Sequence, residues 1–235
     1  MVWLFLLLLK CIAIFCTYFY FIIHQYNDFK KEEKQFYNSG KKPVIVEIPE
    51  MNFLSIRGKG NPNEENGEYK KALELIYAIA YTLKMSYKSD YKIEGFFNYV
   101  VPPLEGLWCS EKEQENSKLE KEKLSWISLI RLPDFIKKED FEWAIKVSTD
   151  KKKKDFSKVE FFTYKEGICV QCVHIGSYDD EPKTILSMEE YARKKGYTFN
   201  ITEKTPHHEI YLSDPRKVDI SKIKTVIRYP IKKIK

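Results

Sequence analysis

A glutamate and a tyrosine two residues apart in a predicted strand are the strongest candidate for a chemical site. Side chains alternate along a strand, so Glu209 and Tyr211 share one face and Ile210 points to the other. A carboxylate among aromatic rings is costly to desolvate and resists ionisation unless a cation compensates its charge. The rings add cation–π attraction. The pattern predicts a pocket for an aromatic or cationic molecule, and the alternative is an exposed glutamate on an edge strand.

A second stretch, Pro-Pro-Leu-Glu-Gly-Leu-Trp at residues 102–108, supplies further candidates. Strict alternation places Glu105 and Trp108 on opposite faces, so we expect either a bulge at Gly106 or only one of the two in the pocket. For Trp108 the alternative is a simple core role. The remaining predicted ligand-binding residues, each with the same alternative, are Trp126, Trp143 and Tyr164.

Histidine and cysteine residues are poorly spaced for holding a metal or cofactor. His174 has no clear second ligand, and the adjacent His207 and His208 point apart in a strand. Cys169 and Cys172 form a single CxxC within a strand, which places their side chains on opposite faces. We therefore expect no metal site and no cofactor, and reduced, structural cysteines typical of a reducing compartment.

The elements predicted to position these residues occur twice along the chain. Each half has two apolar strands, a glycine, a polar loop and a helix with apolar residues at helical spacing. An acidic loop opens the second helix, where its charges suit the positive end of the helix dipole. The predicted ranges are strands 44–48 and 53–57 with helix 68–84, then strands 159–164 and 168–175 with helix 183–195, the two halves being joined by a connector with a helix at 139–146.

The repetition predicts an α+β fold of two pseudo-symmetric strand-helix-strand-strand modules around a central cleft. Pro-x-x-Glu followed by apolar or aromatic residues occurs at 102–108 and again at 206–212. This match places Glu105 and Glu209 at equivalent positions of the two modules. Residues 111–123 are a charged insertion in the first half.

A hydrophobic N-terminal helix is predicted ahead of these modules. Residues 2–23 are long enough to span a membrane, and fourteen of them are Leu, Ile, Phe or Val. Lys10 opposes insertion by about 2.5–3.5 kcal/mol, which the apolar residues outweigh at roughly 0.3–0.6 kcal/mol each. The lysines that follow place the body of the protein in the cytoplasm, tethered by this helix. The alternative is an extension upstream of a native start near Tyr26.

The charge pattern does not suggest a nucleic-acid partner. The net charge is +6, but 31% of the residues are charged and the signs are mixed. The basic runs at 151–154 and 232–235 fall in a connector and at a terminus, without the interleaved aromatics of a nucleic-acid stripe. We expect these runs to be solvated.

Four separated stretches resemble the GyrI-like small-molecule-binding domain. They are Pro-Glu-Met-Asn-Phe-Leu-Ser-Ile-Arg-Gly at 49–58, the stretch at 102–108, His-Ile-Gly-Ser-Tyr-Asp-Asp-Glu-Pro at 174–182, and His-Glu-Ile-Tyr-Leu-Ser-Asp-Pro at 208–215. The predicted division is an N-terminal segment at 1–25 and a GyrI-like domain at 28–233. The resemblance implies a fold shared with SOUL-type haem binders and matches Glu209 to the family's pocket glutamate.

The resemblance implies three functions. The first is binding of lipophilic aromatic or cationic compounds, as in the drug-sensing halves of multidrug-responsive activators, whose helix-turn-helix is missing here. The second is hydrolysis of the cyclopropane ring of DNA-alkylating compounds, a detoxification in which Glu209 would activate water and Tyr211 or another phenol would protonate the leaving oxygen. The third is a protein-interaction module such as a gyrase inhibitor.

Overall fold

The computed structural model describes residues 27–38, 40–110, 124–202 and 204–234. In this part of the chain, seven antiparallel strands are surrounded by helices. In the sheet order β4-β1-β3-β2-β6-β7-β5, strand β7 also pairs with β4. This extra pairing closes six of the strands into a barrel and leaves β5 attached to β7. The predicted α+β class is confirmed, whereas the pseudo-symmetric modules stay a prediction. The strands are β1 (Val44–Lys59), β2 (Leu104–Ser110), β3 (Leu124–Arg131), β4 (Glu160–Ile175), β5 (Tyr197–Phe199), β6 (His207–Tyr211) and β7 (Lys224–Lys233).

Two of the strands are much longer than the sequence pattern predicts. β1 and β4 run as single strands of 16 residues each, where two short strands were expected in both places. Pro49 and Gly167 lie in the two gaps that were expected between the short strands. β1 pairs with β3 only from Phe53 onward, so Pro49 lies where β1 has one partner, β4, and the missing proline N–H costs little.

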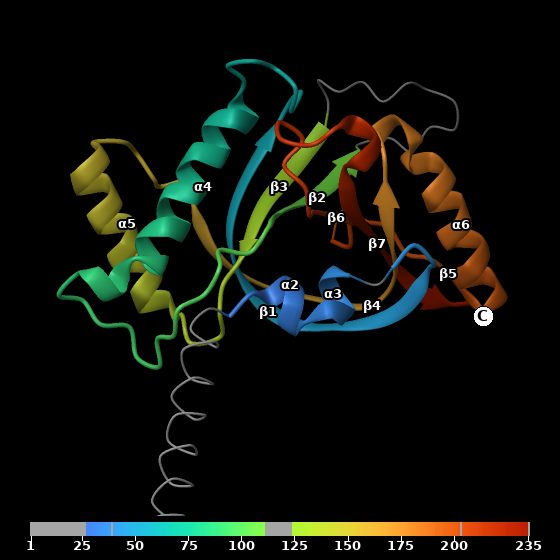
Figure 1. The fold of residues 1–235 in the computed structure, drawn as a ribbon, viewed down its shortest axis with the longest axis horizontal. Helices are drawn as coiled ribbons and strands as arrows, with labels where there is room; N and C mark the ends of the chain where they lie inside the picture. Colours follow the sequence, from blue (N-terminus) through green and yellow to red (C-terminus); the bar gives the residue numbers. More distant parts are fainter. Residues whose placement is uncertain (1–26, 39, 111–123, 203, 235) are drawn as a thin grey trace, which may run out of the picture.

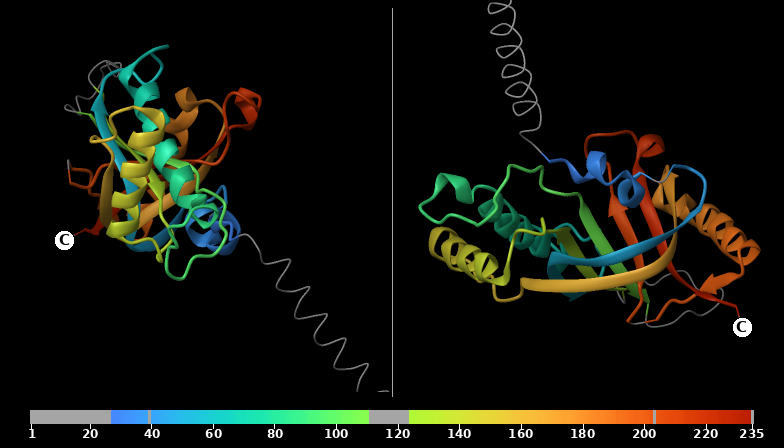
Figure 2. Two further views of the ribbon diagram at one scale, coloured as in Figure 1. Left: turned by 90° about the vertical axis from the view of Figure 1, so that its left-hand side faces the viewer. Right: turned by 90° about the horizontal axis from the view of Figure 1, so that it is seen from below.

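Helices cover the outer face of the barrel on two sides. Helix α4 (Glu68–Lys84), with the predicted bounds, lies on one side of β2 and β6 and helix α6 (Glu181–Lys194) on the other (Figure 1). α5 (Lys138–Lys152), longer than the predicted 139–146, packs beside α4 (Figure 2). The short elements are α2 (Phe29–Glu32), α3 (Lys34–Tyr37), η1 (Ser86–Lys88), η3 (Tyr178–Asp180) and η4 (Ile220–Lys222).

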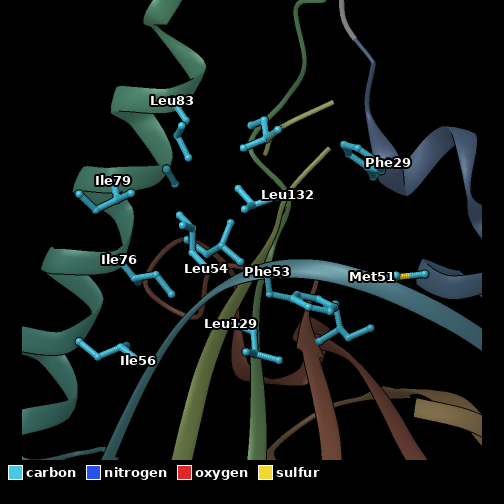
Figure 3. Close-up of a cluster of buried hydrophobic side chains, with 14 of the residues drawn as sticks. Phe29, Met51, Phe53, Leu54, Ile56, Ile76, Ile79, Leu83, Leu129 and Leu132 are labelled. Atoms are coloured by element: carbon cyan, nitrogen blue, oxygen red, sulfur yellow. The ribbon is translucent and has the colours of Figure 1, made fainter. Parts of the chain in front are cut away.

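The main core lies between α4 and the barrel. Ile76, Ile79 and Leu83 recur at helical spacing and face Leu54 and Ile56 of β1, with all five side chains at most 1% exposed (Figure 3). A second cluster holds α6 against β4 and β7 through Met188 and Ala192. These two apolar contacts fix the helices on either side of β2 and β6.

The predicted membrane helix at residues 2–23 lies outside the residues that the structure describes. Within the described part of the chain, no helix is long and apolar enough to cross a bilayer.

Candidate functional site

Strand β6 presents three polar side chains to the outer face of the barrel. His207, Glu209 and Tyr211 alternate with the buried His208 and Ile210. Glu209 pairs with Ile227 of β7, which belongs to the cluster under α6. The three outward residues therefore lie on the face that α6 covers at β7, as strand alternation predicts for Glu209 and Tyr211.

A chain of hydrogen bonds holds the Glu209 carboxylate. The Tyr211 hydroxyl donates to Oε2 of Glu209 at 2.8 Å, and Nε1 of Trp108 donates to the Tyr211 hydroxyl at 2.9 Å. Nε2 of His207 lies 2.9 Å from Oε1. The Glu209 side chain is only 12% exposed, so the alternative of a freely exposed glutamate is wrong. Both carboxylate oxygens are held in place before any ligand arrives.

Gly106 of β2 makes the close approach of these rings possible. It pairs with Glu209, directly beside the hydrogen-bonded side chains. A Cβ atom at this position would lie 2.7 Å from Nε1 of Trp108 and 3.1 Å from the Tyr211 hydroxyl. There is no bulge here: Glu105 pairs with Ile210 and Trp108 with His207, so strict alternation holds and only Trp108 shares the face of Glu209.

Aromatic rings from α4 and η3 complete the cluster. The Tyr69 ring of α4 lies 5.9 Å from that of Trp108, and Tyr178 meets Tyr211 edge-on at 6.3 Å. Burial and then the charge of Glu209 raise the pKa of Tyr178 to about 12 and that of Tyr211 well above its ordinary value. Every ring hydroxyl here is therefore protonated at neutral pH and can donate a hydrogen bond.

Glu181, in the first turn of α6, brings a second carboxylate to the cluster. Burial and then the charge of Glu209 raise its pKa to about 8. Its Oε1 atom is buried and has no hydrogen-bond partner among the described residues. The sequence pattern assigned this acidic residue only to the helix dipole, so its role beside Glu209 was missed. We call Glu209, Glu181, Tyr69, Trp108, Tyr178 and Tyr211 the Glu209 cluster.

Three of the predicted ligand-binding residues lie away from this cluster. Glu105 is 2% exposed inside the barrel, on the opposite face of the sheet from Glu209. Trp143 is on α5, where its ring stacks on Tyr91 at 4.4 Å. Tyr164 faces the barrel interior, and burial and the nearby Glu166 raise its pKa.

Trp126 is placed beneath the site rather than at its surface. It is 2% exposed and pairs with Trp108 across β2 and β3. The edge of the Tyr69 ring meets Trp126 at 5.0 Å. Trp126 therefore supports the two rings of the Glu209 cluster that lie nearest to it.

A second group of charged side chains fills the barrel interior and was not predicted. Nδ1 of His208 lies 3.1 Å from Glu166 and its Nε2 lies 2.9 Å from Glu105. Arg228 also contacts Glu166, at 2.9 Å, and donates to Gln171. All five side chains are buried, and the alternation that turns Glu209 outward turns His208 inward. We call these residues the barrel-interior cluster.

Two carboxyl groups, an imidazole and a guanidinium meet inside the barrel. Burial opposes ionisation of Glu166, but Arg228 and His208 together lower its pKa to about 2. Burial likewise opposes protonation of His208, but Glu166 and Glu105 raise its pKa to about 9. Residues of α3 close the cluster, since Arg228 donates to the Phe36 carbonyl at 2.9 Å. The arrangement ties four strands and α3 together, and each of its five side chains is buried.

The histidine and cysteine candidates for a metal site have structural roles. Nδ1 of His174 lies 2.8 Å from the Thr184 hydroxyl, and its Nε2 lies 2.9 Å from the Ser177 carbonyl. Cys169 and Cys172 are free and buried. The described residues contain no group of three or more His, Cys, Asp or Glu side chains that could hold a metal ion.

The protein is an α+β protein, a six-stranded antiparallel barrel with helices on its outer face. On that face, the Glu209 carboxylate lies among aromatic rings. The sequence profile of the GyrI-like small molecule binding domain matches residues 41–232, and the chain belongs to that family. A search of curated proteins found no significant relative.

Two solved structures from Listeria innocua are similar over most of the chain. One is described as a hydrolase and is 42% identical, with a TM-score of 0.80; the other, an uncharacterized conserved protein, is also 42% identical, with a TM-score of 0.82. In both cases the match covers 88% of this chain and the whole of the other chain.

Proposed function

We propose that this chain binds an aromatic cation at the Glu209 cluster. The observation that carries the proposal is a pair of carboxylates, Glu209 and Glu181, among aromatic rings. No Lys or Arg side chain of the described residues forms an ion pair with either of them. Two negative charges in such surroundings repel each other and are poorly solvated, so one of them must hold a proton unless a cation neutralises it.

The rings suit the apolar part of the same ligand. Tyr178, 38% exposed, is the most accessible of the cluster's rings, whereas Tyr69, Trp108 and Tyr211 are only partly exposed. A flat cation would gain cation–π attraction from these rings and Coulomb attraction from the carboxylates. The family of small-molecule-binding domains to which the chain belongs supports this proposal.

The proposal is tested by titrating the protein with rhodamine 6G, a flat aromatic cation, and following fluorescence anisotropy. We expect saturable binding that Glu209→Gln weakens about tenfold or more, because the substitution keeps the side-chain volume and removes the charge. Glu47→Gln is the matched control, since Glu47 is an exposed strand glutamate. Equal affinities for the native chain and Glu209→Gln, with unchanged unfolding temperatures, would refute the assignment.

A second candidate function is hydrolysis, favoured by the similarity to the Listeria innocua hydrolase. The family resemblance implies that the substrate would be a strained cyclopropane ring. In this proposal Glu209 takes a proton from water while the water oxygen attacks a ring carbon. A tyrosine hydroxyl gives a proton to the oxygen that receives the electrons of the broken ring bond. Because the Tyr211 hydroxyl already donates to Glu209, the more exposed Tyr178 is better placed for this step.

Hydrolysis and simple binding differ in turnover. A hydrolase converts many equivalents of a cyclopropyl-containing DNA-alkylating compound and incorporates oxygen from labelled water, as mass spectrometry would show. Glu209→Gln would abolish this turnover. Capture of a single equivalent without release of product would exclude the hydrolase and leave the binding function standing. Interaction with a protein such as gyrase stays a prediction from the family resemblance.

A further inference from the structure

A hollow lies between α4 and α5, outside the Glu209 cluster. Its volume is about 440 Å³, which falls within the range of about 300–1,000 Å³ that small-molecule sites occupy. One wall consists of Tyr77 and Tyr81 of α4 with Met85, the residue that caps this helix, and the other of Trp143 and Val147 of α5. We call this hollow the α4–α5 groove.

The groove is lined by a second apolar stripe of α4. Tyr77 and Tyr81 of α4 and its capping residue Met85 recur every four residues, on a different side of the helix from the core residues Ile76, Ile79 and Leu83. The rings of Tyr77 and Tyr81 stack at 6.4 Å, and Tyr81 is 52% exposed. The exposed Tyr81 ring, with the partly buried Tyr77 ring stacked on it, offers a flat aromatic molecule a face to pack on.

The ring of Trp143 is held in place on the opposite wall. It stacks on Tyr91 at 4.4 Å with an angle of 10° between the planes, and the Tyr91 hydroxyl donates to Asp140 at 2.9 Å. The Thr82 and Ser148 hydroxyls, 2.9 Å apart, join the two helices near the floor. The groove is therefore formed before any ligand binds.

The charge at the rim determines which ligands fit. Lys151 and Lys152, in the last turn of α5, line the groove and form no ion pair with a described residue. The acidic lining residue Glu74 is neutralised by Lys154, whose Nζ lies 3.0 Å from its carboxylate. The rim thus carries two uncompensated positive charges beside aromatic walls.

We propose that the α4–α5 groove is a second ligand site, which takes an aromatic molecule carrying an anionic group. Its rings would pack against Tyr81 and Trp143, and its anionic group would lie between Lys151 and Lys152. The two sites of the molecule then select opposite charges. This proposal is independent of the function proposed for the Glu209 cluster.

The test uses two dyes with the same rings and different charge. They are 8-anilinonaphthalene-1-sulfonate and its uncharged parent, N-phenyl-1-naphthylamine, each titrated against the full chain by fluorescence. Tyr81→Ala should weaken both dyes, because it removes a ring that both contact. Lys151→Gln with Lys152→Gln should weaken the sulfonate about three- to tenfold and leave the uncharged dye unchanged.

Two control variants separate this site from the rest of the surface. Lys194→Gln with Lys195→Gln removes the same charge from the end of α6 and should change neither titration. Glu209→Gln should leave sulfonate binding as it is. The proposal would be overturned if the affinity for the sulfonate dye stayed the same in Tyr81→Ala and in the double variant Lys151→Gln with Lys152→Gln. A dimer, detected by analytical ultracentrifugation, that Tyr81→Ala dissociates would also overturn it, because the groove would then be an interface between copies of the chain.

Discussion

At the scale of single residues, Glu209 and Glu181 bring two carboxylates into one largely aromatic environment, where burial and then the charge of Glu209 raise the pKa of Glu181 to about 8. Its raised pKa means that the folded chain binds a proton that the unfolded chain has lost above about pH 4.5. The free energy of unfolding therefore falls as the pH rises from about 4.5 to about 8. A bound cation would lower the pKa of Glu181 and release this proton.

Glu181→Gln should remove that dependence. Near pH 8 the variant should be more stable than the native chain by about 1–2 kcal/mol, a figure reduced for the partial exposure of the side chain. Urea unfolding at pH 5 and pH 8 measures the difference. In calorimetry with buffers of different ionisation enthalpy, rhodamine 6G should release a proton from the native chain and none from Glu181→Gln. Equal proton release from both proteins would show that another group carries the proton.

Tyr211→Phe tests the hydrogen bonds around Glu209. The substitution removes the hydroxyl that links Trp108 to the carboxylate, and leaves both partners short of a hydrogen bond. We expect a loss of about 1–2 kcal/mol in the free energy of unfolding and weaker dye binding. Tyr81→Phe is the control, because the Tyr81 side chain is half-exposed. Identical urea midpoints for Tyr211→Phe and the native chain would mean that the hydrogen-bond chain adds nothing to stability.

At the scale of elements, the site depends on the pairing of β2 with β6 between two helices. Strand alternation in the sequence predicted the shared face of Glu209 and Tyr211, and the helix at 68–84 is confirmed with its bounds. The motif match did not show that Glu105 and Glu209 lie on opposite faces of the sheet, because it is Gly106, not Glu105, that the register pairs with Glu209. A sequence motif does not specify which residues lie opposite each other across two strands.

The residues that the sequence missed come from elements far away along the chain. Tyr69 begins α4, while Tyr178 and Glu181 precede or begin α6, and only the packing of both helices brings them to β6. His208 and Arg228 were missed for another reason. A buried charge appears in a sequence as a polar residue in a strand, and its partner on another strand can be identified only from the register.

Gly106→Ala tests this register directly. The added methyl group would overlap Nε1 of Trp108, so the indole and Tyr211 must move apart. We expect a destabilisation of about 1–3 kcal/mol and loss of rhodamine 6G binding. Adding Trp108→Phe removes the crowded ring nitrogen and should recover part of the lost stability, but not the hydrogen bond to Tyr211. If Gly106→Ala bound the dye as the native chain does, the close packing of the cluster would not matter for binding.

At the scale of the whole molecule, the barrel-interior cluster joins β2, β4, β6 and β7 and sets how stability varies with pH. Glu166 has a lowered pKa, so its contribution is present above about pH 4.5 and is lost as the pH falls towards 2. His208 has a raised pKa, so its contribution is complete below about pH 6.5 and is lost as the pH rises through 9. The Glu181 contribution is lost from about pH 4.5 upward, so the three groups together place maximal stability near pH 4.5.

His208→Gln separates the interior charge from the other contributions. Glutamine fits a similar space but leaves Glu105 and Glu166 facing the single charge of Arg228, so we expect a loss of about 3–5 kcal/mol at pH 6. The loss should shrink towards pH 9, because the native histidine also gives up its proton there. Urea unfolding from pH 6 to 9.5 in a Glu181→Gln background isolates this effect. His174→Gln is the control, because it removes a buried histidine bonded to a hydroxyl and a carbonyl. In this variant the free energy of unfolding should still fall as the pH rises from 6 to 9.5. The opposite outcome is that the free energy of unfolding of His208→Gln falls between pH 6 and 9.5 by as much as that of the chain that keeps His208. That result would mean that the barrel interior holds no titrating proton and that Arg228 alone balances its carboxylates.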